Sequence, residues 1–247
     1  MPTFGEQVLD LIDEIDNKHE KHERFIRRSL LRALKNLRAR SFSFMEKRAT
    51  FDSIPEAPGY VSSINGSLPV GIQMIRYIAD AETGMQAIEK DIGFTKIYQK
   101  RPYTAVGTYS IPFYWFWSND VTEREAEIDS TTTPPQVITE IRGPGIEVAP
   151  TAASVRTFEI YYKADPARDE TTGNEIVWEG QSDAAINDWL RLGEPALRCR
   201  VLRDYYTTMS KDAEAAQLMQ AEYVSSMSDL QSLSGVKQQN VQARHYF

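Results

Sequence analysis

The sequence predicts an α+β fold in which helices from both chain ends form a bundle and an antiparallel β domain is inserted between them. Apolar residues recur at helical spacing in about the first 40 residues and again after residue 183. The centre instead alternates aromatic or β-branched residues with polar ones, as half-buried strands do. The predicted parts are a helical bundle (1–40 and 183–234), a β-rich insertion (41–182) and an extended C-terminal arm (235–247).

Two amphipathic helices are expected at the start of the chain. Thr3 and Glu6 match a T-x-x-E capping box, which predicts a first helix from about Thr3 to Asp16. Asn17, with Glu20 three residues later, is a second start signal, and a long helix should follow through Ala39. The apolar stripes are Phe4, Val8, Leu11, Ile12 and Ile15 in the first helix, and Ile26, Leu30, Ala33, Leu34 and Leu37 in the second.

Period-two alternation predicts strands from Ser41 onward. The alternating residues are Phe42 and Phe44, then Val70, Ile72 and Met74, and later Phe158, Ile160 and Tyr162. The aromatic run 103–117 predicts one bent strand or two, whereas 119–135 is polar and predicts a surface loop. The segment 143–145, Gly-Pro-Gly, predicts a tight hairpin between strands at 137–141 and 146–148. Residues 85–100 are ambiguous, with a short helix as one alternative.

Helical periodicity returns near the C-terminal end. Asp183 is expected to cap a short helix to Leu192, Gly193 to end it, and Pro195 to open the next helix in its first turn. After a turn near Ser210, a last helix is expected to end at Gly235. Its apolar stripe, which we interpret as helix packing rather than as a binding groove, comprises Ala216, Met219, Tyr223, Met227 and Leu230.

Charge is segregated along the chain far more sharply than the formal net charge of −7 indicates. Residues 1–16 carry five acidic residues and no base, whereas residues 17–40 carry nine bases and two acidic residues. We interpret this pattern as an acidic and a basic helix that pair, in preference to a nucleic-acid-binding helix. A net-acidic remainder could also line a passage through which DNA slides without tight phosphate contacts.

Several classes of function find no support in the sequence. Cys199 is the only cysteine and lies in a helical stretch, so it is expected to be inert core, with no intrachain disulfide or Cys-built zinc site. His19 and His22 have a spacing that could hold a metal, but charged neighbours at a helix start favour solvated histidines. No nucleotide-binding or nucleophile-elbow motif is present. We therefore expect no enzyme activity, no metal and no cofactor.

No apolar signal-peptide core and no membrane-spanning stretch stand out, so the sequence predicts a soluble protein. The run 113–117, which contains Trp115 and Trp117, could offer stacking faces to a sugar or a base. We expect one side of this run to be core and the other to contact a neighbouring subunit. Carbohydrate binding, or action on a carbohydrate, through this run remains the alternative function.

Taken together, the segments resemble the head-to-tail adaptor proteins of tailed bacteriophages, the family that includes podovirus tail tubular proteins docked beneath the portal. The resemblance spans nearly the whole chain in order, as a pattern of helices, strands and spacing. The residues that carry it are Phe4, Val8, Ile12, Arg32-Ala33-Leu34, Arg48-Ala49-Thr50-Phe51, Ile146-Glu147-Val148-Ala149-Pro150, Phe158-Glu159-Ile160-Tyr161-Tyr162, Trp189-Leu190, Tyr205-Tyr206 and Asp212-Ala213-Glu214-Ala215.

The resemblance implies a structural protein of the virion neck, made in the bacterial host cytoplasm. Such a protein forms a ring, expected to be a homododecamer, that binds the portal protein above and a tail or nozzle protein below. Genome DNA passes through the channel during ejection without sequence-specific binding. No membrane is involved.

The resemblance also changes how the polar C-terminal segment with its aromatic tip is interpreted. By itself this segment indicates a frayed terminus, whereas in an adaptor it suits an arm that orders on the portal. The portal-binding candidates are Val236, Gln239, Val241, Arg244, His245, Tyr246 and Phe247. The subunit-interface candidates are Arg27, Arg28, Arg32, Trp115 and Trp117.

Overall fold

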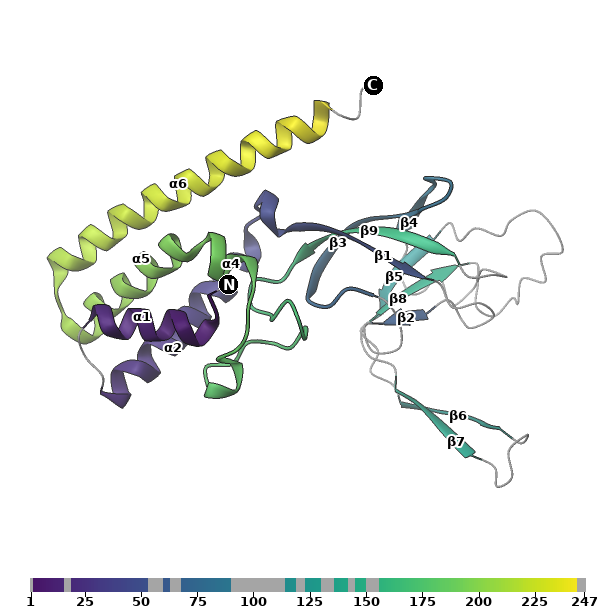
Figure 1. Ribbon diagram of the computed structural model, residues 1–247, viewed down its shortest axis with the longest axis horizontal. Helices are drawn as coiled ribbons and strands as arrows, with labels where there is room; N and C mark the ends of the chain where they lie inside the picture. The colour runs from purple at the N-terminus through teal and green to yellow at the C-terminus, as the bar shows by residue number, and fades with distance from the viewer. Residues whose placement is uncertain are drawn as a thin grey trace. The chain divides into compact units, whose positions relative to one another are not determined.

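The computed structural model of the chain describes residues 2–15, 19–52, 60–62, 68–89, 114–118, 123–129, 136–141, 145–149 and 156–243 (Figure 1). It combines helices with β-sheet, which confirms the α+β class. The chain divides into two compact units. The helical unit comprises Met1–Lys47, Val70–Met74 and Lys163–Phe247, and the sheet unit comprises Arg48–Pro69 and Ile75–Tyr162.

The helices of the helical unit come from both ends of the sequence. They are α1 (Phe4–Glu14), α2 (Glu20–Asn36), α4 (Asp188–Leu192), α5 (Glu194–Tyr205) and α6 (Ala213–Ala243). The chain also forms four single turns: the 3₁₀ turns η1 (Leu37–Ala39), η2 (Ser43–Met45) and η3 (Gly180–Ser182), and the π-helical turn η4 (Tyr206–Ser210) between α5 and α6. In this unit α5 packs against both α2 and α6, and α1 packs against α2 (Figure 1).

The first helix begins as its sequence predicts and is then fixed by a distant loop. Thr3 and Glu6 form the capping box, with each side chain accepting from the other residue's backbone N–H. The two N–H groups that follow Thr3 are bonded outside the helix: Phe4 N donates to Ala185 O at 2.9 Å and Gly5 N donates to Asp183 O at 3.0 Å. These bonds satisfy donors that a helix start leaves free.

One hydrophobic core contains residues from α1, α2, α4, α5 and α6. Its most deeply buried side chains include Phe4, Ile26, Leu30, Leu34 and Trp189. Met227 of α6 is buried in it and Met219 packs against it, so the methionine stripe is packing surface as expected. Cys199 is also buried, and burial raises the pKa of its thiol, as expected for an unreactive core cysteine.

The two opposite-charged helices do pack together, but through their apolar faces and not through their charges. The ion pairs that tie them to other elements join Glu14 of α1 to Arg198 of α5, and Arg27 of α2 to Asp183. No ion pair between α1 and α2 is found within residues 2–15 and 20–36. Hydrophobic burial therefore explains the pairing, and the expected electrostatic reason was wrong for these residues.

The larger sheet has the strand order β1-β9-β3-β4-β5-β8-β2. Its strands are β1 (Glu46–Asp52), β2 (Tyr60–Ser62), β3 (Ile72–Asp80), β4 (Gln86–Glu89), β5 (Tyr114–Ser118), β8 (Gly145–Ala149) and β9 (Thr157–Ala164). The pairs β3–β4, β5–β8 and β2–β8 are antiparallel, whereas β4–β5 is parallel. Phe158 and Ile160 of β9 are buried and alternate with exposed residues, as predicted.

Three expectations for the central region were wrong, and the ambiguity at 85–100 is resolved for residues 86–89. Residues 43–45 form a 3₁₀ turn, because Phe42 and Met45 are both buried in the helical core. Residues 86–89 form β4, and 123–129 form β6, which pairs with β7 (Gln136–Ile141) in a separate two-stranded sheet. The expected hairpin at 143–145 does not pair its flanking strands, since β7 pairs with β6 and β8 pairs with β5 and β2. Five of the seven residues of β6 are charged, which explains why its sequence resembled a loop.

Two helix boundaries also differ from expectation. Asn187, not Asp183, caps α4: its Oδ1 accepts from Leu190 N at 2.9 Å, while Asp183 accepts from Arg27. Helix α6 does not end at Gly235 but continues to Ala243, because an interior glycine costs only about 1 kcal/mol. Gly193 ends α4 and Pro195 lies in the first turn of α5, as predicted.

The chain contains the same five-residue turn twice, as Asp-x-x-Thr-Gly at 80–84 and at 169–173. In each turn the aspartate is buried and its carboxylate accepts from the backbone and side chain of the threonine. In each, the glycine N–H donates to the aspartate carbonyl, and its φ is positive, at +70° for Gly84 and +73° for Gly173. The repeated chemistry therefore fixes two tight turns, one in each unit.

The two turn glycines are expected to tolerate alanine unequally. Gly84→Ala should cost about 1 kcal/mol, since it strains a positive φ but the added Cβ has no neighbour within 4 Å. Gly173→Ala should cost about 2 kcal/mol, because its Cβ would also lie 2.7 Å from Val70 Cβ. Urea unfolding of both variants measures the two losses, and equal losses would contradict this account.

Candidate functional site

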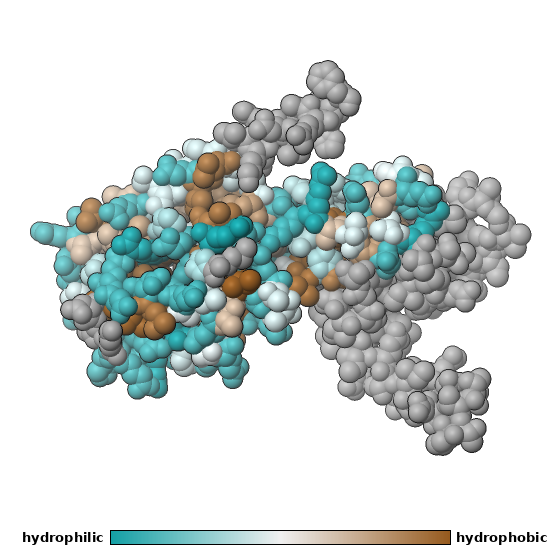
Figure 2. Space-filling model, in the orientation of Figure 1, coloured by the Kyte–Doolittle hydropathy of each residue, from teal (hydrophilic) through white to brown (hydrophobic). Residues whose placement is uncertain are grey.

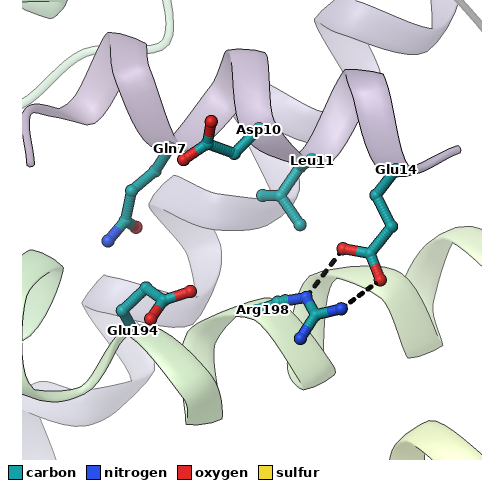
Figure 3. A pocket seen from close by; sticks show the side chains of 6 residues that line it. All are labelled: Gln7, Asp10, Leu11, Glu14, Glu194 and Arg198. Atoms are coloured by element: carbon teal, nitrogen blue, oxygen red, sulfur yellow. Dashed lines mark hydrogen bonds and ion pairs between the residues drawn. The ribbon is translucent and has the colours of Figure 1, made fainter. Parts of the chain in front are cut away.

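The best-defined pocket of the helical unit lies between α1 and α5 (Figure 3). It has a volume of about 130 Å³. Side chains from α1 and from α5 converge on it. The lining residues are Gln7, Asp10, Leu11, Glu14, Glu194 and Arg198. Three carboxylates and one guanidinium give this pocket an acidic lining.

The only base in the pocket is already neutralised. Arg198 donates from Nε and Nη2 to the two Glu14 oxygens, at 2.7 and 2.5 Å, in a bidentate pair that Figure 3 draws as dashed lines. The hydrogen bonds that Arg198 donates to Glu14 raise the pKa of Arg198 above its ordinary value. The carboxylates of Asp10 and Glu194 make no hydrogen bond or ion pair with any residue of the described chain. Two carboxylates are thus left to attract a cationic group.

The pocket opens beside a continuous acidic surface on α1. We define the acidic face as the exposed residues Glu6, Leu9, Asp10, Asp13 and Glu14, all on the side of α1 opposite its buried residues. Leu9 lies at one edge of this face, beside Glu6 and Asp13, and is 59% exposed. An isolated exposed leucine is common in proteins, but here it is flanked by carboxylates on one helix face.

A complementary surface covers the outer side of α2. We define the basic face as the exposed residues Lys21, Arg24, Arg28, Arg32 and Lys35, which a period of 3.6 residues places opposite buried Ile26, Leu30 and Leu34. Arg24 pairs with Glu20, Lys35 pairs with Glu175 at 2.8 Å, and Arg28 stacks on the Trp178 ring at 4.3 Å. Within the described residues, Lys21 and Arg32 have no acidic partner.

The predicted interface arginines do not lie on one surface. Arg28 and Arg32 are exposed on the basic face. Arg27 points elsewhere: its side chain is 12% exposed, donates to Glu23 at 2.8 Å and forms a bidentate pair with Asp183. The hydrogen bonds that Arg27 donates to Asp183 raise the pKa of Arg27, so its charge is used within the chain. Its role in a subunit contact stays a prediction.

The aromatic candidates belong to β5 of the sheet unit. Trp115 is 3% exposed, so nearly all of its side chain is core. Trp115 also lines a pocket of about 300 Å³, together with residues of β3 and β4. Trp117 pairs with Ile146 in the backbone register of β5 and β8, and its side chain lies outside the described part of the structure.

The portal-arm candidates fall at the end of α6 or beyond it. Val236, Gln239 and Val241 lie within α6, so the backbone of 235–243 is helical and not extended as expected. Arg244, His245, Tyr246 and Phe247 lie outside the described residues. Ser234 marks the last described side chain, and its Oγ accepts from Ser43 N at 3.1 Å.

The two histidines at the start of α2 have structural partners. The His19 ring nitrogen caps the helix by accepting from Lys21 N at 3.1 Å, and His22 Nδ1 lies 2.9 Å from the Tyr205 hydroxyl. Among the residues that the structure describes, no group of His, Cys, Asp and Glu is arranged to hold a metal ion. No helix in the same residues has the length and apolar character needed to cross a membrane.

The sequence hypotheses missed the acidic pocket, although part of its signal was visible. The run of five acidic residues without a base in 1–16 was recognised, but it was interpreted as an acidic helix that pairs with the basic one. Glu194 and Arg198 could not be assigned to that surface, because they follow about 180 residues later and reach it only through the packing of α1 near α5. No protein-family model matches the chain, and a search of curated proteins found no relative.

Proposed function

We propose that this protein is a structural head-to-tail adaptor of a tailed bacteriophage, a ring subunit that joins the portal to the tail. The observation that carries the proposal is the shared core, to which helices near both ends of the sequence contribute. Such a core supports a helical bundle closed by both chain ends with a β-rich insertion between them. That order of elements is the pattern on which the resemblance to adaptors depends.

The partners in this proposal are the portal protein, a tail or nozzle protein, and further copies of the same chain as a ring, expected to be a dodecamer. Genome DNA passes through the ring and is not bound at specific bases. The protein resides in the virion neck after synthesis in the host cytoplasm. It acts by geometry, because each copy repeats the same contacts around a closed symmetry.

The end of α6 is the portal-docking element in this proposal. The last described contacts of α6 within the helical unit are those of Leu230 and Ser234, and we assign the residues that follow to a partner. The alternative, a sugar-binding virion protein, is weakened by the burial of Trp115, since stacking on a sugar requires an accessible ring face.

The test is to mix the full chain with portal rings from the same virus and image the product by electron microscopy, beside a chain ending at Ser234. We expect the full chain to add a second ring and the shorter chain to fail, because it lacks the docking element. Binding by both chains would keep the adaptor role and remove the docking role of residues 235–247. Binding by neither would overturn the adaptor proposal, and glycan-dependent Trp fluorescence would then test the alternative.

A further inference from the structure

We infer that adjacent copies of this chain associate through the acidic face of α1 on one copy and the basic face of α2 on the next. The inference deepens the proposed function, and its ring form rests on that function, since it assigns the surfaces by which copies would join. It is carried by the charges that the folded helical unit leaves exposed.

The first step concerns the acidic face and its pocket. Helix α1 exposes carboxylates but no base, and Asp10 and Glu194 have no partner in the described chain. Exposed Leu9 adds an apolar contact at one edge of the same face. Protein interfaces usually combine apolar contacts with charged groups that remain accessible at their rim.

The second step concerns the basic face. It extends over Lys21–Lys35, which at 1.5 Å per residue is about 21 Å, long enough to cover the roughly 16 Å of α1. Arg32 and Lys21 have no acidic partner in the described residues, and Arg28 is held in an extended position over Trp178. These side chains can reach a carboxylate on another molecule without breaking an ion pair.

The third step excludes a contact within one copy. Helices α1 and α2 bury their apolar faces in the same core, so their charged faces both point outward. The acidic face cannot turn to its own basic face without exposing that core. A second copy can satisfy both, and because the two surfaces differ, the contact is head-to-tail and repeats from copy to copy.

A nucleic acid is the other occupant that a basic helix face attracts. The second-copy contact is favoured because the same chain carries a matching acidic surface, whereas phosphate would be repelled by the carboxylates that adjoin α2 in space. Charge complementarity of this kind sets the register and rate of association and makes it sensitive to salt.

The test uses two charge-reversed chains and their mixture. Asp10→Lys with Asp13→Lys reverses the acidic face, and Arg28→Glu with Arg32→Glu reverses the basic face. Self-association is measured by sedimentation velocity at about 50 mM salt, where screening is weak. Each reversed chain alone should associate roughly tenfold or more weakly than the parent, because attraction is replaced by repulsion at each contact.

Mixing the two reversed chains in equal amounts should restore association, with the two chains alternating, since each reversed face again meets its opposite. Asp229→Lys with Glu159→Lys is the matched control: both residues are exposed and outside either face, so association should stay at the parent level. Circular dichroism verifies that each variant is folded. Rescue by mixing cannot arise from a folding defect.

Three results would overturn the inference: a parent chain that stays monomeric at low salt, reversed chains that associate as the parent does, or a mixture that shows no rescue. The parent chain could instead bind DNA through its phosphates. If the Arg28 and Arg32 variant loses that binding but keeps self-association, the basic face is assigned to nucleic acid. The measurement contains no portal, so failure of the subunit contact and failure of portal docking are separate results.

Discussion

Gly193→Ala is expected to lower the free energy of unfolding of the helical unit by about 3 kcal/mol. An added Cβ would lie 2.0 Å from Cε3 and 2.6 Å from Cζ3 of Trp189, far inside van der Waals contact. The indole ring cannot move away, because it is buried and packs edge-to-face against Phe42 and Phe44. The ring centroids are 5.1 Å apart in each pair. Relief of the clash must therefore disrupt the aromatic cluster or separate α4 from α5.

The loss is measured by urea unfolding followed by far-ultraviolet circular dichroism, which reports on the helices. Gly180→Ala is the matched control, since its Cβ would meet only the end of the Asp183 side chain at 3.6 Å. That control should change the free energy of unfolding by less than about 0.5 kcal/mol. If both variants unfold at the same urea concentration, the close approach of Gly193 to Trp189 does not constrain the fold.

Asp169→Ala is expected to destabilise the helical unit by a similar amount, about 3 kcal/mol. The buried carboxylate accepts from Thr171 N at 3.3 Å, Thr172 N at 3.1 Å, the Thr172 hydroxyl at 2.6 Å and Ile186 N at 3.1 Å. Removing it takes away the acceptor that these three backbone donors share and that holds the turn to the segment before α4. The loop leads to α4, so the lost hydrogen bonds should also weaken the packing of Trp189 in the core.

The contribution of Asp169 should depend on pH in a defined direction. Burial alone raises the pKa of this carboxyl, but the hydrogen bonds from Thr172, Ile186 and Thr171 outweigh burial and lower it. Below a pH of about 4 the unfolded chain takes up the proton first, so the stabilisation is complete above that value. It is lost as pH falls through the lowered native pKa.

Asp169→Asn isolates this effect, because it retains one acceptor oxygen but cannot ionise. Its free energy of unfolding should lie well below that of the parent at pH 6, and the gap should narrow at pH 3. Asp229→Ala on the exposed side of α6 serves as a control and should unfold like the parent at both values. A gap that is the same at pH 3 and pH 6 would show that the carboxylate charge contributes nothing.

The helices of this protein were largely predictable because their determinants are local. The capping box at Thr3, the Gly193 stop and the Pro195 start all appear where the sequence placed them. The strands were less predictable, because pairing partners are distant in sequence. Five of the seven residues of β6 are charged, so its sequence did not indicate a strand. A strand at 146–148 was predicted, but its pairing with β5 and β2 was not.

The candidate site was also predictable only in part. The acidic and basic charge of the first two helices was evident from composition, and so were Arg28 and Arg32 as exposed candidates. Arg27 could not be separated from them, because its partner Asp183 lies 156 residues away. Trp115 likewise required the sheet before it could be assigned to the core.

The sequence by itself determined the α+β class, the helical segments and the separation of charge, since each depends on composition or on spacing within a few residues. Only the tertiary structure decided which charges are used inside the chain and which remain at its surface. In the folded helical unit the apolar stripes of α1 and α2 share one core, and their opposite charges face outward. The physical reason is that burying apolar area outweighs a surface ion pair worth about 1 kcal/mol or less.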